Sequence, residues 1–310
     1  MSLKFLKAGM QTTLQAGERR GNRHFGVPAA GPADRLSMSL ANRLVGNPES
    51  AVALEFTLTG GKLVFSEDIG FALTGADVKA RLNNVPVHMH ETYLAEAGDI
   101  LDIGPALNGC RTYLALAGDV VADEFLSSKS TYLPAKFGGL DGRALQDGDE
   151  IQIRHHRLPD EVETPQALRP LFNDLFLLQV CPGPDFDMLG ADQDIFQQEF
   201  TVGQRSSRMG VQLEDGVLEL SNAERLQSAA VFQGTVQLPP DGQPFVLLAD
   251  SQATGGYPHV LQVSRSDRFQ LGQLRPGAKV KFICRTPEEA RERFRARAEG
   301  YKDWLAELLI

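Results

Sequence analysis

The chain has 310 residues, a hydrophobic fraction of 42% and a formal net charge of −9. This length fits two domains of ordinary size, and the hydrophobic fraction is enough for two cores. The negative charge opposes binding to nucleic acid or to an anionic membrane surface. No apolar run approaches the roughly 20 residues of a membrane-spanning helix, and the N-terminus has no apolar stretch of signal-peptide length. We therefore expect a cytoplasmic protein.

The sequence gives little indication of a metal site. The three cysteines are an odd number at wide spacing and form no C-x-x-C pair, so a zinc site or a disulfide framework is not indicated. His88 and His90, with Glu91 beside them, are the best candidate ligands, because residues two apart on a strand share a face. Since no third ligand is marked and exposed strand histidines are common, we expect no resident metal.

Turn residues are spread along the whole chain. Thirty glycines and seventeen prolines separate short segments rich in valine, isoleucine, leucine and phenylalanine, a pattern typical of a mainly β fold. A glycine-led turn followed by alternating apolar residues recurs in residues 98–104, 148–153 and 277–283. Two repeats of one barrel type would explain the recurrence. Asn83-Asn84 predicts a tight hairpin turn, because asparagine tolerates positive φ.

Only a few segments have helical spacing. Residues 33–45 place leucines on one face, with Asp34 in the first turn and Gly46 after the last one. Residues 190–200 are a second candidate.

The third candidate lies near the C-terminus. Thr286, Pro287 and Glu289 form the start signal of a helix, with an N-cap, a proline at the first position and a capping box. Its apolar stripe continues through Leu305 and Leu308, which predicts an amphipathic helix.

A polar, proline-bearing stretch divides the chain. We interpret residues 156–169 as a linker between an N-terminal β-barrel domain, residues 1–155, and a C-terminal β-barrel domain, residues 170–310, which carries the terminal helix.

Familiar single-chain catalytic motifs are absent from the sequence. It has no G-x-x-x-x-G-K-[ST] phosphate loop, no G-x-S-x-G elbow and no H-E-x-x-H pair. A self-contained nucleotide hydrolase or zinc peptidase is therefore not indicated.

Two glycine-rich segments in the first half carry polar residues that packing does not require. Residues 26–35 lead into the N-terminus of the first predicted helix, where free N–H groups suit a carboxylate or phosphate. A plain loop capped by Asp34 is the alternative. In residues 137–143, Arg143 could clamp an anion, although the segment could equally form a hairpin.

Two further segments lie in the second half. Ser207 places a hydroxyl beside the guanidinium of Arg208, which suits contact with an anion. Residues 250–258 follow an apolar strand, and functional side chains often gather at such strand ends.

Taken together, these segments resemble one family over nearly the whole chain, and so many motifs in fixed order are specific. The matching segments, in chain order, are Ala8–Gln15, Gly26–Asp34, Ala41–Asn47, Leu54-Glu55, Ala72–Ala76, Arg111–Ala115, Ser130-Thr131, Gly138–Arg143, Pro182–Pro184, Ser207–Gly210 and Gln252–Pro258. The chain resembles the KipA family, also called allophanate hydrolase subunit 2 or biotin-dependent carboxyltransferase-like proteins. Its length and motif order are nearest to the PxpC branch, which supplies one subunit of 5-oxoprolinase.

The resemblance implies two cyclophilin-like β-barrel domains and a subunit of an ATP-dependent 5-oxoprolinase. That enzyme opens 5-oxoproline to L-glutamate with ATP hydrolysis, and its other subunits are of the KipI/PxpB type and the LamB/YcsF-like PxpA type. ATP, with Mg²⁺, would be bound by this chain or shared with a partner. No Met-Lys-Met-type biotinylation site is present, so any biotin must come from another chain.

Family membership does not fix function, and two alternatives stay open. The chain could be a KipA-like regulator that binds a KipI-type kinase inhibitor. It could also be the carboxyltransferase component of a urea carboxylase and allophanate pathway.

The sequence departs from the usual family pattern at two places. Where relatives often read Thr-Val-Gln-Asp-x-Gly-Arg, this chain has Ala16 in place of the acid and Glu18 in place of the second glycine. Where a Gly-Ser pair commonly precedes Ser-Thr, residues 127–129 read Ser-Ser-Lys.

The family motifs also supply the candidate site residues, which we expect to line one cleft between the barrels at a partner interface. Candidates for catalysis, through orientation and polarisation of the substrate, are Asp34, Glu55, Ser207 and Tyr257. Candidates for binding substrate or nucleotide are Arg35, Asn42, Arg143, Arg208, Gln252 and Thr254.

Overall fold

The computed structural model describes residues 1–190, 195–221 and 226–306, and the chain folds into two compact units. The first unit contains Met1–Arg19, Ala30–Phe172 and the described residues from Gly300 onward. The second contains Arg20–Ala29 and Asn173–Glu299. The predicted linker, residues 156–169, therefore packs as part of the first unit.

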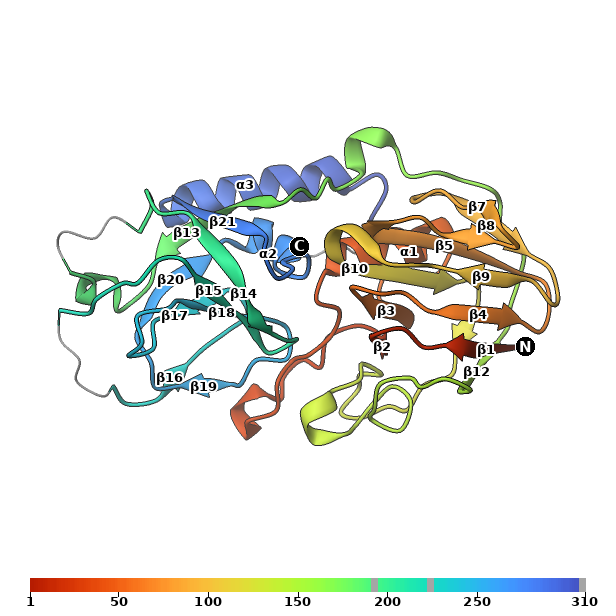
Figure 1. Ribbon diagram of the computed structural model, residues 1–310, viewed down its shortest axis with the longest axis horizontal. Coiled ribbons are helices and arrows are strands. Elements are labelled where there is room, and N and C mark those ends of the chain that lie inside the picture. Colours follow the sequence, from red (N-terminus) through yellow and green to blue (C-terminus); the bar gives the residue numbers. More distant parts are fainter. Residues whose placement is uncertain (191–194, 222–225, 307–310) are drawn as a thin grey trace. The chain divides into compact units, whose positions relative to one another are not determined.

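Two antiparallel sheets build the first unit (Figure 1). The seven-stranded sheet has the order β11 (Asp119–Val120), β12 (Glu150–Arg154), β1 (Ser2–Lys7), β4 (Lys62–Phe65), β9 (Ile100–Asp102), β6 (Arg81–Leu82) and β7 (Val85–Pro86). The five-stranded sheet has the order β2 (Gln11–Gln15), β3 (Ala53–Thr57), β10 (Ala106–Leu116), β5 (Ile69–Val78) and β8 (Thr92–Ala95).

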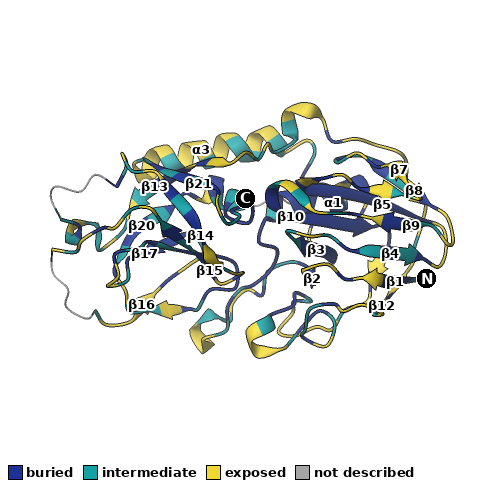
Figure 2. Ribbon diagram, viewed as in Figure 1, coloured by how far each residue is buried: buried dark blue, intermediate teal, exposed yellow. Residues whose placement is uncertain are grey.

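Both sheets contribute to one hydrophobic core in the first unit. Leu3, Phe65 and Ile151 come from the seven-stranded sheet, and Phe56 and Leu114 come from the five-stranded sheet. All five side chains are at most 1% exposed. β5 and β10 are buried over most of their length, as Figure 2 shows, so they read as nearly continuous apolar runs.

The helix α1 (Arg35–Leu44) packs on β5 and β10. Its N-cap is Asp34, whose side chain accepts a hydrogen bond from the backbone N–H of Ser37, and Gly46 adopts a positive φ after its last turn. The predicted helix over residues 33–45 is confirmed. Two 3₁₀ turns complete the unit, η2 (Leu133–Ala135) and η3 (Gln166–Leu168).

The second unit is a closed barrel of seven strands (Figure 1). Around the barrel the order is β13 (Leu175–Pro182), β20 (His259–Val263), β17 (Thr235–Gln237), β18 (Phe245–Leu247), β15 (Gly210–Glu214), β14 (Phe200–Ser206) and β21 (Lys279–Cys284). Smaller elements are η1 (Arg23–Phe25), η4 (Phe186–Met188), η5 (Arg265–Asp267), α2 (Arg268–Leu271) and the paired strands β16 (Ala229–Ala230) and β19 (Thr254–Gly255).

The C-terminal helix α3 (Pro287–Tyr301) begins with the predicted capping box. The backbone N–H of Thr286 donates to the Glu289 carboxylate at 2.9 Å, and the N–H of Glu289 donates to the Thr286 hydroxyl at 3.2 Å. Phe294 lies under the Arg265 guanidinium, 4.7 Å from its ring centre. The helix ends earlier than its sequence pattern indicates, and Leu308 lies outside the described residues.

The mainly β fold with a C-terminal helix is confirmed. The hairpin turn is also confirmed, since Asn83 and Asn84 both have positive φ between β6 and β7. Of the helix expected over residues 190–200, residues 191–194 lie outside the described part, and β14 begins at Phe200. No helix within the described ranges is long and apolar enough to cross a membrane.

Candidate functional site

The predicted site residues of the first unit include two buried carboxylates beside α1. Glu55 on β3 accepts a hydrogen bond from the backbone N–H of Ala33 at 2.9 Å and another from the Tyr113 hydroxyl at 2.7 Å. That hydroxyl accepts the N–H of Asp34 at 2.8 Å. Burial and the charge of Glu55 raise the pKa of Tyr113 well above its ordinary value, so the phenol stays protonated and continues to donate.

Asp34 and Glu55 are both 0% exposed. Asp34 also accepts the Ser37 hydroxyl at 2.5 Å, and the Arg111 guanidinium lies 3.4 Å from Glu55. These contacts fix the start of α1 against β3 and β10. The structure thus gives both carboxylates a framework role, and their participation in catalysis stays a prediction.

The two other polar candidates on α1 differ in exposure. Asn42 is fully buried and donates to the backbone oxygens of Ala51 at 2.9 Å and Glu49 at 3.3 Å, which ties α1 to the segment before β3. Arg35, the first residue of α1, is half-buried.

Arg143 is held by a carboxylate of its own unit. Its guanidinium donates to both oxygens of Asp149, at 2.5 and 3.0 Å, and lies 3.6 Å from Asp141. Hydrogen bonding with Arg143 lowers the pKa of Asp149 below its ordinary value. The glycine-rich segment that precedes Arg143 therefore presents a guanidinium with a bidentate partner, and its use as an anion clamp stays a prediction.

The second unit contains a buried ion pair under its polar loop. Arg208 donates through two nitrogens to the two oxygens of Asp250, each at 2.9 Å, and the side chains are 3% and 1% exposed. The backbone N–H of Asp250 also donates to the carbonyl of Arg208 at 2.9 Å. The start of the loop at residues 250–258 is thereby fixed to the segment between β14 and β15.

The same loop borders a hollow of about 890 Å³ within the second unit. Gln252 and Tyr257 line it, together with Gln237 of β17. Gln237 is 1% exposed, donates to the carbonyl of Tyr257 at 3.2 Å and accepts from the Gln252 amide at 3.4 Å. Tyr257 is 51% exposed, so the hollow combines the held amide of Gln237 with a hydroxyl that is open to a ligand. Thr254 and Ser207 are also exposed but do not line the hollow.

One of the two adjacent glycines of this loop makes room for the amide of Gln237. A Cβ atom on Gly255 would lie 2.5 Å from the Gln237 side-chain nitrogen, closer than any side chain tolerates. A Cβ atom on Gly256 would meet only ordinary contacts, with the Ser228 hydroxyl at 3.5 Å. Gly255 therefore permits the close approach of the loop backbone to the amide, whereas the space beside Gly256 would admit a Cβ atom.

Within the second unit, residues 20–29 contact the loop at residues 250–258 through Arg23. Arg23 of η1 donates to the carbonyl of Val231 and to that of Gln252, the latter at 3.4 Å. Its guanidinium stacks over Phe232, 5.2 Å from the ring centre. Sequence reasoning missed both Arg23 and Gln237, because neither stands in a motif and their partners lie far away along the chain.

The hollow suits a small polar molecule more than a polyphosphate. Its described lining contains Glu219 and Asp241 but no lysine, arginine or histidine, so a polyphosphate would be repelled. Proline and leucine side chains form much of the wall, and the glutamine amides offer donors and acceptors side by side. Such a pair matches the adjacent N–H and C=O groups of a cyclic amide.

The ten predicted residues divide equally between the units. Asp34, Arg35, Asn42, Glu55 and Arg143 belong to the first unit, and the other five belong to the second. In the second unit Arg208 holds the loop that carries Gln252, Thr254 and Tyr257. One cleft shared by both sets stays a prediction.

Comparison with known proteins gives concordant results. The family described as "Carboxyltransferase domain, subdomain A and B" matches residues 25–284. The chain is 36% identical over 290 residues to the C subunit of 5-oxoprolinase from Escherichia coli, covering 93% of each chain. It is 34% identical to the C subunit of 5-oxoprolinase from Haemophilus influenzae, covering 99% of this chain and 98% of that one.

A solved structure is also similar over nearly the whole chain. The crystal structure of the K. lactis urea amidolyase matches 98% of this chain with a TM-score of 0.91 and 28% sequence identity. The match spans only 20% of that much longer protein.

Proposed function

Because this chain belongs to the family of carboxyltransferase domains with subdomains A and B, we propose that it is one subunit of an ATP-dependent 5-oxoprolinase. The observation that carries the proposal is the degree of sequence similarity. The chain is 36% and 34% identical to two bacterial 5-oxoprolinase C subunits, and each alignment covers more than nine-tenths of both aligned chains. The identity to the K. lactis urea amidolyase is lower, at 28%.

The proposed reaction requires chemistry that this chain does not supply alone. Opening the lactam consumes one water molecule, and ATP hydrolysis consumes a second to give ADP and phosphate. A lactam carbonyl is a weak electrophile, and phosphorylation by ATP would activate it. ATP, with Mg²⁺, would be bound by this chain or shared with a KipI-like partner, and a LamB/YcsF-like chain would complete the enzyme.

The hollow of the second unit supports recognition of a cyclic amide. Its glutamine amides would pair with the N–H and C=O edge of the lactam, and the Tyr257 hydroxyl would reach the ring from the open side. The described lining offers no cation to the carboxylate of 5-oxoproline, so this group would point out of the hollow, toward a counter-charge supplied by a partner subunit. The buried Arg208–Asp250 pair would hold the loop in place before the substrate arrives, which reduces the ordering cost of binding.

Reconstitution tests this proposal. The purified chain, its KipI-like and LamB/YcsF-like partners, Mg²⁺, ATP and 5-oxoproline are combined, and glutamate and phosphate are measured. We expect both products in equal amounts and no glutamate when any subunit is omitted.

Substitutions in the hollow connect this activity to the site. Gln252→Ala should raise the KM for 5-oxoproline by about tenfold, the effect expected when one buried hydrogen bond to substrate is lost. Gln212→Ala is the matched control, because Gln212 donates to Gln243 at 2.5 Å and does not line the hollow. Equal KM values for the two variants would remove the hollow from the substrate site.

Carboxyl transfer onto a small amide such as urea is the second candidate, favoured by the TM-score of 0.91 to the K. lactis urea amidolyase. Urea also presents N–H and C=O groups side by side. An assembled complex that consumes carboxybiotin and urea, and releases no glutamate from 5-oxoproline, would establish this function instead. Tight binding of the KipI-like partner without turnover of either substrate would indicate the KipA-like regulator.

A further inference from the structure

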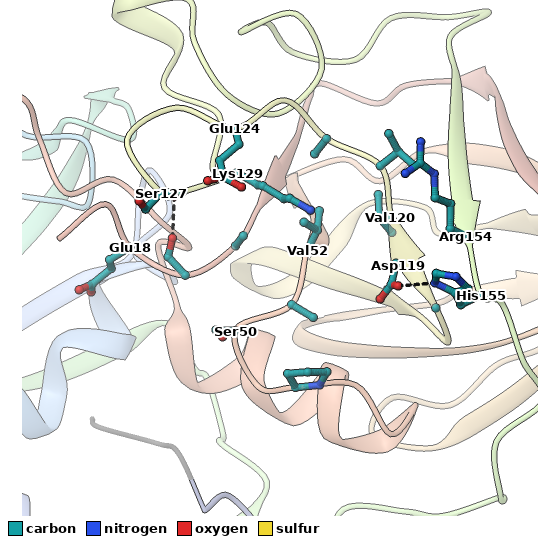
Figure 3. A pocket seen from close by; sticks show the side chains of 18 residues that line it. Glu18, Ser50, Val52, Asp119, Val120, Glu124, Ser127, Lys129, Arg154 and His155 are labelled. Atoms are coloured by element: carbon teal, nitrogen blue, oxygen red, sulfur yellow. Dashed lines mark hydrogen bonds and ion pairs between the residues drawn. The ribbon is translucent and has the colours of Figure 1, made fainter.

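The first unit contains a separate hollow of about 680 Å³, shown in Figure 3. It is lined by residues 16–18, 48, 50–52, 118–122, 124, 127–129 and 154–155. Its floor is apolar, since Ala16, Val52 and Val120 are at most 7% exposed. None of the ten residues predicted from the sequence lines it, and it shares no residue with the hollow of the second unit. Its volume is in the ordinary range for a small-molecule site.

The charged groups around this hollow are of both signs. Lys129 is half-buried, and Figure 3 shows its side chain extending across the hollow toward Val52. The described part of the chain provides no acidic partner within ion-pair distance of its ammonium. Arg154 lies on the same rim. The acidic groups are Glu18, Glu124 and Asp119, the last of which contacts His155 at 2.8 Å.

The Lys129 side chain is half-buried and has no acidic partner within ion-pair distance among the described residues. A ligand carboxylate beside it would accept a charge-assisted hydrogen bond from its ammonium. The three acidic side chains disfavour a polyphosphate but would accept an ammonium group. A small molecule that carries both a carboxylate and an ammonium would satisfy the lysine and the acidic side chains.

We propose that the hollow beneath Lys129 binds a small α-amino acid as its zwitterion, with the carboxylate toward Lys129 and the ammonium toward Glu124. The amino acid lies in the first unit and touches none of the residues assigned above to the cyclic amide. The chain would thus hold two different small molecules.

Titration calorimetry of the full chain without partners tests the proposal, with L-glutamate, glutarate and Mg-ATP as probes. Glutarate has the carbon chain and carboxylates of L-glutamate but lacks the ammonium. We expect L-glutamate to bind at least tenfold more tightly than glutarate, because one charged hydrogen bond contributes about that factor. Mg-ATP should not compete with L-glutamate.

Two substitutions and one control assign the binding to this hollow. Lys129→Met should weaken L-glutamate binding at least tenfold, whereas Lys79→Met, which removes an exposed lysine of the same unit, should leave it unchanged. Glu124→Gln, at an exposed position, should reduce the preference for L-glutamate over glutarate without affecting the fold.

Three results would overturn the proposal. One is the absence of any L-glutamate binding up to about 10 mM, where even weak small-ligand sites fill. Another is equal affinity for glutarate and L-glutamate. The third is unchanged L-glutamate binding in both the Lys129 and the Glu124 variants.

Discussion

Both units bury carboxylates, but the carboxylates of the two units have different kinds of partner. In the first unit Asp34 and Glu55 receive hydrogen bonds from backbone N–H groups and from Tyr113, and both carboxylates are fully buried. In the second unit Asp250 is satisfied by Arg208, and the chain that follows it carries exposed polar groups.

The difference teaches how polar motif residues divide their roles. The hydrogen bonds of Asp34 and Glu55 hold the start of a helix, whereas the buried Arg208–Asp250 pair holds a loop whose other polar side chains are exposed. Substitutions that break these buried contacts of the first unit should therefore change its stability. Substitutions in the second should separate stability, at Arg208 and Asp250, from ligand recognition at Gln252 and Tyr257.

The largest expected effect is that of Arg208→Met. Removing the guanidinium leaves the Asp250 carboxylate buried without its main partner, which should lower the free energy of unfolding of the second unit by about 3–5 kcal/mol. Hydrogen exchange followed by mass spectrometry would locate the loss in β15 and in residues 250–258.

A double variant provides the control for this change. Arg208→Met combined with Asp250→Leu removes both charges, so it should recover a large part of the lost stability. If the single and double variants are equally unstable, the Arg208–Asp250 pair contributes packing rather than charge compensation. The proposed difference between the two units would then be wrong.

A second prediction concerns pH and the first unit. His90 is 6% exposed, and burial, followed by the charge of Arg169, lowers its pKa to about 4. The unfolded chain, with an ordinary histidine pKa of about 6.5, binds a proton that the folded unit does not bind between these values. Stability is therefore fully present above about pH 6.5 and falls, by about 3 kcal/mol in total, as the pH decreases toward 4.

His90→Asn removes the titrating imidazole. The backbone should keep its conformation, because His90 has a φ of 66° and asparagine accepts positive φ. Urea unfolding followed through Trp304, which packs on the first core, should show a steeper loss from pH 7 to 4.5 in the natural chain than in the variant. If the free energy of unfolding falls equally with pH in the natural chain and in the variant, groups other than His90 cause the acid sensitivity.

Local features of the fold could be predicted from the sequence, because their partners are near in the chain. The capping box at Thr286 and Glu289 spans three residues, and Asp34 caps α1 through Ser37 at the same spacing. The turn at Asn83-Asn84 follows from the backbone preference of asparagine alone.

The contacts that define the candidate site could not be predicted from the sequence in this way, because their partners lie far apart along the chain. Glu55 meets Tyr113 across 58 positions, Arg208 meets Asp250 across 42, and Arg23 meets Gln252 across 229. Motif order identified the segments, but only the register of β3 with β10 and the closure of the barrel bring these residues together. Polar character alone could not separate side chains of the framework from those open to a ligand.

Tyr113→Phe tests the framework role of the first unit. The change deprives the Asp34 N–H of its acceptor and Glu55 of a donor, so two buried polar groups lose a partner. We expect the free energy of unfolding of the first unit to decrease by about 2 kcal/mol. Tyr93→Phe is the matched control, because Tyr93 bonds to His88 and Glu91 in a half-exposed place and should cost less than about 1 kcal/mol.

The smallest effect on stability is expected at Tyr257. Half of this residue is exposed, and the described residues offer its hydroxyl no hydrogen-bond partner, so Tyr257→Phe should change the free energy of unfolding by no more than about 0.5 kcal/mol. In the reconstituted enzyme the same variant should still raise the KM for 5-oxoproline, because the hydroxyl is available to the ligand. A variant that loses stability instead, or that keeps its KM, would place Tyr257 with the framework residues and remove the distinction between the two units.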